Sequence, residues 1–293
     1  MNNEYSEILN LFSNVTKPGS NLKGGHGQSF LIRIGNENIL FDTGSSGTIL
    51  LENMKQLNID PNEISKLILS HGHYDHTRGL PKLLDARNKP LKIYAHPNVR
   101  EEKVAKVLFF KKDIGFPELT SEQEKKAIFK FNSEPIEFNG ILRTTGEIHE
   151  RKYREGVEPR ALHKENGEYK IDPVRDDISV LLDVIDGQVI ITGCAHAGVL
   201  NICEYAKINS NKPIKAIIGG THMARYSEED VLETAEKFIN EFDNPTLYLN
   251  HCTDRLPYKF MKRTKAIDIL QTQFGEEKIQ PCYVGTKLEF KTP

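Results

Sequence analysis

The sequence has no tryptophan and only four cysteines, none of them paired as Cys-x-x-Cys. Disulfide frameworks belong to small secreted domains, so we expect reduced thiols and a cytoplasmic protein. No stretch approaches the roughly 18 consecutive apolar residues that a membrane span needs, so no membrane association is expected. The polar and acidic first residues also lack the basic-then-apolar plan of a secretory signal.

A strong net charge is missing as well. The 39 Lys and Arg residues nearly balance the 41 Asp and Glu residues, which gives a net charge of −2. Proteins that hold nucleic acid through bulk charge show a basic excess, so no nucleic-acid partner is expected. A chain of 293 residues is long enough to bury a sizeable core, and we expect a soluble protein with a single domain over residues 1–293.

Strands and helices alternate along most of the chain. Apolar, β-branched or aromatic runs predict strands over 30–34, 38–41, 66–70, 91–95, 136–145, 179–185, 187–192, 215–218 and 246–249. Helical spacing of apolar residues predicts helices over 48–58, from 199 onward, over 227–242 and over about 257–273. This alternation, together with antiparallel hairpins, is typical of α/β layers.

Two charged stretches interrupt the pattern. Residues 98–130 are rich in Lys and Glu, and we expect one or two surface helices there, forming a helical insertion beside the main sheet. Residues 147–177 read as a charged loop with a basic part at 151–175. That part is either a solvated loop or a lid over an anionic substrate.

The segment from Ser70 to Leu80 carries the chemistry. Three histidines and an aspartate fall within six residues, directly after an apolar strand. Neutral imidazole and carboxylate are ligands that suit zinc, iron or manganese. Alternate side chains of an extended segment share a face, so His71 and His73 can bind one metal. If a helix follows, Asp75 and His76 can address a second; the alternative is a polar loop whose histidines cap a helix, which is costly to bury without metal or partners.

The pattern His-x-His-x-Asp-His after a strand resembles the signature of the metallo-β-lactamase superfamily, and the resemblance extends over nearly the whole chain. It implies an αββα four-layer sandwich, with two mixed sheets packed face to face and a metal cleft at one edge. It also implies two metal ions with a hydroxide between them as nucleophile. The implied ligands are His71, His73 and His196 for the first ion, and Asp75, His76 and His251 for the second.

Two other positions of the family pattern are filled. Asp42, in Phe41-Asp42-Thr43-Gly44, matches the strand-end aspartate that supports a ligand histidine from behind, or it is only a turn-former. His251, in Asn250-His251-Cys252, follows a late strand where the family places its final histidine.

Two positions depart from the pattern. Cys194, in Gly193-Cys194-Ala195-His196, stands where most members carry an aspartate that bridges both metals. Cys194 is either an additional ligand, as in some lactamases, or a small buried residue, and His196 is the favoured source of the imidazole. Glu147 stands where many members carry a histidine, and could bind metal, contact substrate or cap a loop.

The motifs SHGHYDHTRGL, GCAHAGVLN, GGTHM and NHCT together resemble the branch that includes the archaeal dihydropterin ribofuranosyl-aminobenzene phosphate synthases. In this setting Asp75 is a catalytic candidate that orients water or protonates the leaving group. His222, in GGTHM, is a second candidate that binds an anionic group or passes protons; a packing role is the alternative. The loop Gly24-Gly25-His26-Gly27 lacks the lysine of a phosphate loop, although His26 could reach substrate.

The resemblance implies a metal-dependent hydrolase of an anionic, phosphate-bearing small molecule, with two zinc ions per chain. Iron and manganese stay open as the metal. An acyl or lactone hydrolase, a non-haem di-iron redox protein on the same fold, and a metal-binding protein without turnover are the alternatives. The sequence leaves the oligomeric state open, a homodimer included.

Overall fold

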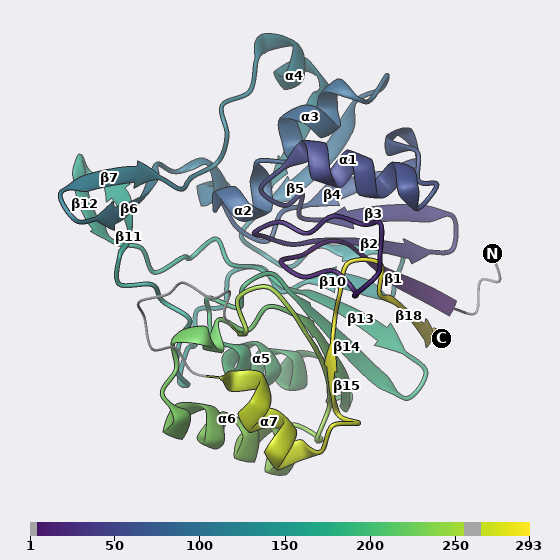
Figure 1. Cartoon of the computed structure of the whole chain (residues 1–293), viewed down its shortest axis with the longest axis vertical. Helices are drawn as coiled ribbons and strands as arrows, with labels where there is room; N and C mark the ends of the chain where they lie inside the picture. The colour runs from purple at the N-terminus through teal and green to yellow at the C-terminus, as the bar shows by residue number, and fades with distance from the viewer. Residues whose placement is uncertain (1–4, 255–264) are drawn as a thin grey trace. The chain divides into compact units, whose positions relative to one another are not determined.

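The structure is a computed structural model that describes residues 5–254 and 265–293. The chain forms two compact units, each assembled from separate segments (Figure 1). The first unit comprises Met1–Ser133, Val157–Asp176 and Tyr283–Phe290, and the second comprises Glu134–Gly156, Asp177–Cys282 and Lys291–Pro293. The chain therefore passes between the units several times, and the single domain expected over 1–293 stays a prediction.

The first unit is built on a seven-stranded sheet in the order β18-β1-β2-β3-β4-β5-β8. Its strands are β1 (Tyr5–Phe12), β2 (Ser29–Ile34), β3 (Glu37–Phe41), β4 (Lys66–Ile68), β5 (Leu91–Ala95), β8 (Ala127–Phe131) and β18 (Lys287–Lys291). Strands β1, β2 and β3 pair antiparallel, whereas β3, β4, β5 and β8 run parallel. The carboxyl ends of β3 and β4 are neighbours, because Phe41 pairs with Ile68.

Helices α1 (Gly47–Gln56) and α3 (Leu80–Asp85) pack on this sheet. Leu50 and Met54 lie one turn apart on α1 and are both fully buried, as an amphipathic helix requires. The Ser46 side chain accepts a hydrogen bond from the Ile49 amide and so caps the start of α1. The predicted helix over 48–58 is thereby confirmed, and it begins directly after the turn that follows β3.

Residues 98–130 are not the helical insertion that the sequence predicts. They contain η2 (Pro97–Arg100), β6 (Lys103–Val107), β7 (Phe110–Asp113), α4 (Ser121–Lys126) and then β8. The loop expected over 147–177 likewise contains β11 (Ala161–Glu165) and β12 (Glu168–Ile171), and these four strands form a small sheet in the order β12-β11-β6-β7. The expectation was wrong because it weighed the lysines and glutamates above Val104, Val107 and Phe110, whose shapes favour strands.

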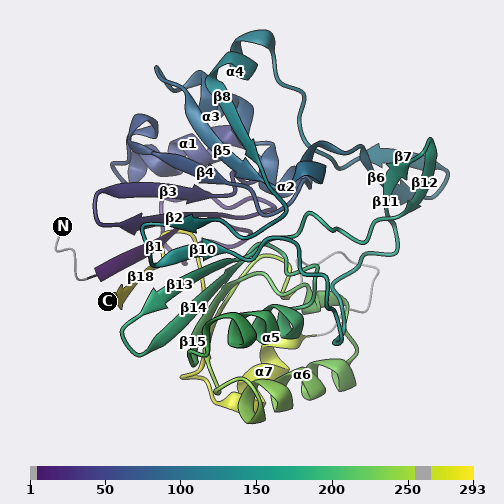
Figure 2. The same cartoon turned by 180° about the vertical axis from the view of Figure 1, so that it is seen from behind.

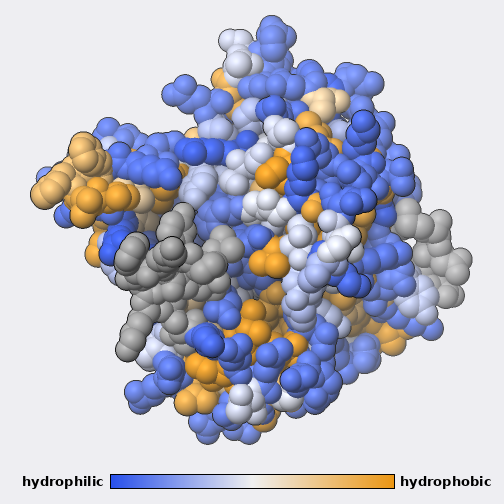
Figure 3. Space-filling model, viewed as in Figure 1, coloured by the Kyte–Doolittle hydropathy of each residue, from blue (hydrophilic) through white to orange (hydrophobic). Residues whose placement is uncertain are grey.

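The hairpin of β6 and β7 ends in an apolar tip. Val107 pairs with Phe110, so Leu108 and Phe109 form the two-residue turn, and their side chains are 81% and 97% exposed. Apolar colouring marks this tip in Figure 3. Leu108 has a φ of 53°, a conformation that such turns usually assign to Asn or Gly. The tip therefore places apolar side chains where turn chemistry favours polar ones.

The second unit is built on another mixed sheet of seven strands, in the order β17-β16-β15-β14-β13-β10-β9. Its strands are β9 (Glu137–Phe138), β10 (Leu142–Thr144), β13 (Val180–Val184), β14 (Gly187–Thr192), β15 (Ile214–Gly219), β16 (Thr246–Leu249) and β17 (Ile279–Pro281). Strands β9, β10, β13 and β14 pair antiparallel, and β14 to β17 run parallel. The loops that follow β14, β15 and β16 therefore leave from one edge of this sheet.

Helices α5 (Val199–Ser210), α6 (Glu228–Asn240) and α7 (Ala266–Phe274) gather beside this second sheet (Figure 2). Their apolar residues share one buried cluster with β14, β15 and β16. A capping box between Ser227 and Asp230 starts α6, which confirms the helix predicted over 227–242. Of the helix expected over 257–273, residues 257–264 lie outside the described residues. Among the residues that the structure describes, no helix combines the length and the apolar character that a bilayer crossing requires.

Candidate metal centre

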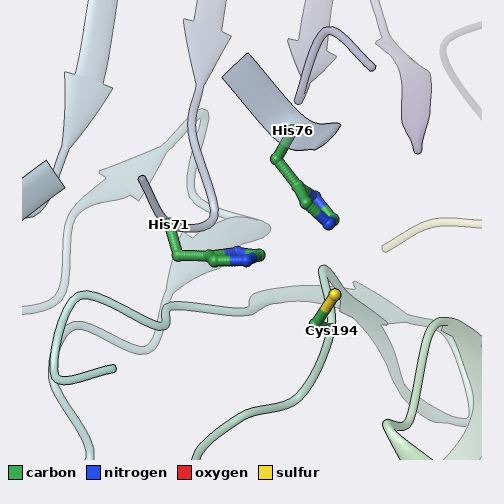
Figure 4. Close-up of side chains that lie close together, drawn as sticks. All are labelled: His71, His76 and Cys194. Carbon is green, nitrogen blue, oxygen red and sulfur yellow. The ribbon is translucent and has the colours of Figure 1, made fainter. Parts of the chain in front are cut away.

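The segment that follows β4 in the first unit carries the His-x-His-x-Asp-His motif. The backbone is extended at His73, and α2 (Tyr74–Thr77) begins directly after it, so Asp75 and His76 lie on a helical turn. All four side chains are buried. The ring centroid of His71 lies 4.6 Å from that of His73 and 4.2 Å from that of His76. The rings of His71 and His76 extend toward the same region (Figure 4).

Asp42, directly after β3, lies behind these histidines. Its Oδ2 atom accepts a hydrogen bond from the Ser70 hydroxyl at 2.7 Å and lies 2.6 Å from His76 Nδ1. Its Oδ1 atom accepts from the Ser70 amide at 2.7 Å. Asp42 has no exposed surface and a φ of 64°, a left-handed conformation that Asp tolerates better than most residues. It is therefore more than a turn residue, because three polar groups of the motif segment converge on it.

This network fixes which ring nitrogen of each histidine carries the proton. A carboxylate can only accept hydrogen bonds, so His76 Nδ1 must be the protonated nitrogen. The single Ser70 hydroxyl proton goes to Asp42, so Ser70 Oγ accepts from His71 Nδ1 at 2.9 Å. Both rings then carry their lone pair on Nε2, the form in which metal-binding histidines are held by a partner on the other nitrogen. This buried donor set fits a divalent metal ion.

A glycine loop, Gly24–Gly27, reaches Asp75, the carboxylate of the motif. His26 Nε2 lies 3.1 Å from Asp75 Oδ2. Gly27, with a φ of 123°, lies so close to α2 that a Cβ there would meet the Asp75 carbonyl oxygen at 1.9 Å. The Gly24–Gly27 segment is thus packed on the motif, with the His26 side chain half exposed.

Sequence reasoning missed three buried charges next to the motif. Lys103 comes from a stretch that was expected to form one or two surface helices, and Asp172 and Asp176 come from one that was expected to be a charged loop. The Gly72 amide donates to Asp176 Oδ2 at 2.7 Å, and both Asp172 and Asp176 contact Lys103. The sequence contains no signal for this cluster, because lysine and aspartate in charged stretches are normally exposed.

In the second unit, His196 lies on the loop after β14. Its Nδ1 atom is 2.7 Å from the Gly156 carbonyl oxygen, and the Gly156 amide in turn donates to the His196 carbonyl oxygen at 2.9 Å. A carbonyl only accepts, so Nδ1 carries the proton and the lone pair again lies on Nε2. His196 is 2% exposed. Its arrangement therefore repeats the one found at His71 and His76.

Cys252 forms hydrogen bonds with the loops that follow β14 and β15 in the second unit. The His222 amide donates to Cys252 Sγ at 3.3 Å, and Cys252 Sγ donates to the Cys194 carbonyl oxygen at 3.6 Å. Ligand atoms of Cys194, His251 and Cys252 all lie within 4.8 Å of one another. Cys194, drawn in Figure 4, is 3% exposed, so it is both a buried small residue and a member of a possible ligand group.

The catalytic candidate His222 follows β15 in the left-handed conformation, with a φ of 54°. Its ring centroid lies 4.5 Å from that of His196. A Cβ on Gly156 would meet the His222 Cβ at 2.8 Å and the Ala195 carbonyl oxygen at 2.9 Å. Close packing against a glycine thus places His222 beside His196.

The remaining candidates lie in the charged stretch. Glu147 Oε1 lies 3.5 Å from His149 Nδ1. Within the stretch 151–175, the basic side chains that form ion pairs with acidic ones are Arg151, Lys152, Arg154, His163, Lys164 and Lys170. Much of its positive charge is therefore balanced locally.

Comparison with known proteins places this geometry in a family. The protein-family model of the metallo-beta-lactamase superfamily matches residues 22–240 of this chain. The chain is 33% identical over 238 residues to a 7,8-dihydropterin-6-methyl-4-(beta-D-ribofuranosyl)-aminobenzene-5'-phosphate synthase from Methanocaldococcus jannaschii, covering 78% of this chain and 81% of that one. It is also 31% identical over 231 residues to an uncharacterized protein of the same archaeon, covering 78% of this chain and 84% of that one.

A solved structure of a metal-dependent hydrolase of the beta-lactamase superfamily superimposes with a TM-score of 0.81 at 26% identity. The superposition covers 98% of this chain and 99% of the other. The predicted metallo-β-lactamase fold, with mixed sheets and helices, is confirmed. The chain belongs to the metallo-beta-lactamase superfamily and has the fold of its metal-dependent hydrolases.

Proposed function

We propose that this chain is a dinuclear metal-dependent hydrolase that acts on an anionic, phosphate-bearing small molecule. The observation that carries the proposal is the contact of Asp42 with Ser70 and His76, which fixes the protonation of two buried histidines. Burying polar groups is costly unless their polar atoms are paired, and a bound ion would pair with the Nε2 lone pairs of these histidines. These donor atoms suit a divalent metal ion.

The proposed ligand set is that of the family. It comprises His71, His73 and His196 for the first ion, and Asp75, His76 and His251 for the second. Support comes from each unit separately, because His71 and His76 in the first and His196 in the second are all held at Nδ1. Cys194 is proposed as an additional ligand, since its sulfur lies near His251. Nitrogen and oxygen ligands of this kind suit zinc, with iron and manganese as the alternatives.

Two divalent ions held by these residues would supply Lewis acidity, which lowers the pKa of a water molecule and stabilises negative charge that develops on the substrate. Asp75 is held by α2 and by His26, and we assign it the orientation of the attacking water. His222 lies beside His196, and we assign it the contact with the anionic group of the substrate. Each role requires only hydrogen bonds, made by the side chain of Asp75 in one case and of His222 in the other.

The metal content of the purified protein tests the ligand set. Protein prepared without chelators is expected to hold two zinc ions per chain, and His196→Ala is expected to hold fewer, because the variant loses one imidazole ligand. Plasma mass spectrometry of both proteins provides the measurement. Two iron ions would favour the redox alternative instead. A single ion in the wild type, or an unchanged content in His196→Ala, would contradict the assignment.

The substrate class is tested with the metal-loaded enzyme. The archaeal relative at 33% identity is named as the synthase of a compound that carries a 5'-phosphate, which supports a phosphate-bearing substrate. We therefore expect turnover of phosphoesters, assayed as phosphate or alcohol release from a panel of sugar phosphates and aryl phosphomonoesters and phosphodiesters. A matched panel of lactones and thioesters separates the acyl hydrolase alternative. Turnover confined to the second panel would overturn the phosphate assignment while leaving the metal site intact.

A further inference from the structure

A buried group of three charges lies beside the motif in the first unit. Lys103 Nζ, at the start of β6, lies 2.8 Å from Asp172 Oδ2 and 2.8 Å from Asp176 Oδ1. All three side chains are at most 3% exposed. Burial alone would lower the pKa of Lys103, but the Asp176 and Asp172 carboxylates outweigh burial and raise it, so the lysine stays charged.

These charges contact the motif at two points. The Gly72 amide donates to Asp176 Oδ2 at 2.7 Å, and Asp172 Oδ2 lies 3.9 Å from His73 Nε2. On its other side Gly72 packs so closely that a Cβ would meet the Val99 carbonyl oxygen at 2.2 Å. Gly72 lies between His71 and His73, so any displacement of its amide would move both histidines.

The Asp172 carboxylate is itself held rigidly. Asp172 Oδ1 accepts a hydrogen bond from the Val174 amide at 2.8 Å. Val174 is fully buried and has a φ of 48°, which is a genuine outlier for a β-branched residue. Such strain persists only where the surrounding structure over-determines it, and it is common at functional sites.

Stability alone does not explain the arrangement. Buried ion pairs are often no more stabilising than well-packed apolar residues of the same volume, because each charge loses its hydration. We propose that Lys103 is a positioning residue for the metal site: with Asp172 and Asp176 it fixes the Gly72 amide, and through it the metal-binding atoms of His71 and His73. This inference rests on the proposed function.

Cobalt titration tests the inference. Co²⁺ is added to metal-free protein and followed by its visible absorption, which reports both affinity and ligand geometry. Lys103→Met is expected to weaken Co²⁺ binding about 10–100-fold and to change the spectrum, as loss of outer-shell partners of metal ligands does. Lys103→Arg is expected to restore much of the affinity because it keeps the charge. Lys106→Met, at an exposed lysine on the same strand, is expected to match the wild type.

A second variant covers the case in which Lys103→Met does not fold. Asp172→Asn keeps an oxygen for the Val174 amide and removes one charge, and we expect it also to weaken Co²⁺ binding. Wild-type affinity and spectrum in Lys103→Met, or in Asp172→Asn where the first variant does not fold, would overturn the inference alone. A wild-type protein that binds no Co²⁺ would overturn the proposed function together with it.

Discussion

Hydrolysis by the His76→Ala variant is expected to fall by about 10³-fold or more in kcat/KM. The variant removes an imidazole from the proposed second ion. Metal-assisted charge stabilisation contributes several kcal/mol to such reactions, which corresponds to about this factor. His76 is fully buried and hydrogen-bonded to Asp42, so its imidazole is fixed in one orientation. The measurement is steady-state kinetics on the phosphoester that the panel identifies.

A graded pair of variants separates the metal role of His76 from a structural one. Asp42→Asn leaves every proposed ligand in place but replaces the acceptor of His76 Nδ1, so a smaller loss of about 10–100-fold is expected. His96→Asn is the control. The side-chain oxygen of the new asparagine can accept the hydrogen bond that the Asn98 backbone amide donates to His96 Nδ1. Equal losses in all three variants would indicate general damage to the fold and would contradict the assignment.

Removal of the metal is expected to abolish activity and to lower the thermal midpoint by about 10 °C. An ion present at about 1,000 times its Kd stabilises the folded state by about 4.1 kcal/mol, and each kcal/mol shifts the midpoint of a large domain by about 2–4 °C. Removal of the ion leaves the buried imidazoles without it, and unpaired polar atoms in the interior lower the free energy of unfolding. The midpoint is measured by calorimetry before and after dialysis against a chelator.

Readdition of zinc gives the matching control. The midpoint and the activity are both expected to return on titration with zinc, and to return less completely in His76→Ala. A midpoint that does not respond to the chelator in the wild type would mean that the motif histidines are stable without metal. That result would contradict the proposed role of the Asp42 network.

The local sequence points to much of the candidate site because the proposed ligands follow apolar strands. His71 and His73 follow β4, and His196 and His251 follow β14 and β16. The neighbouring residues in the sequence are therefore enough to place these histidines at strand ends. Lys103, Asp172 and Asp176 could not be found this way. Their burial depends on the pairing of β6 with β11, in which Lys103 lies opposite His163, 60 positions later in the chain.

The same distinction applies to the fold. Compact apolar runs such as β14 and β15 are recognisable because both faces are buried and the run is continuous. Strands β6 and β7 are polar enough to suggest a helix, and the pairing of β6 with β11 on one side and with β7 on the other selects the extended form. Strand β1 mixes polar and apolar residues, and one of its two neighbours, β18, lies more than 270 residues away in the sequence.

The position of β18 has a consequence for biosynthesis. The edge of β1 away from β2 is covered by β18, which is formed by residues 287–291. At about 5–20 residues per second, a ribosome needs roughly 15 s to a minute to reach β18 after making β1. During that interval the nascent first sheet presents an open strand edge, the feature that templates aggregation. Until β18 emerges, the newly made chain therefore has an edge on β1 to which a strand of another chain can pair.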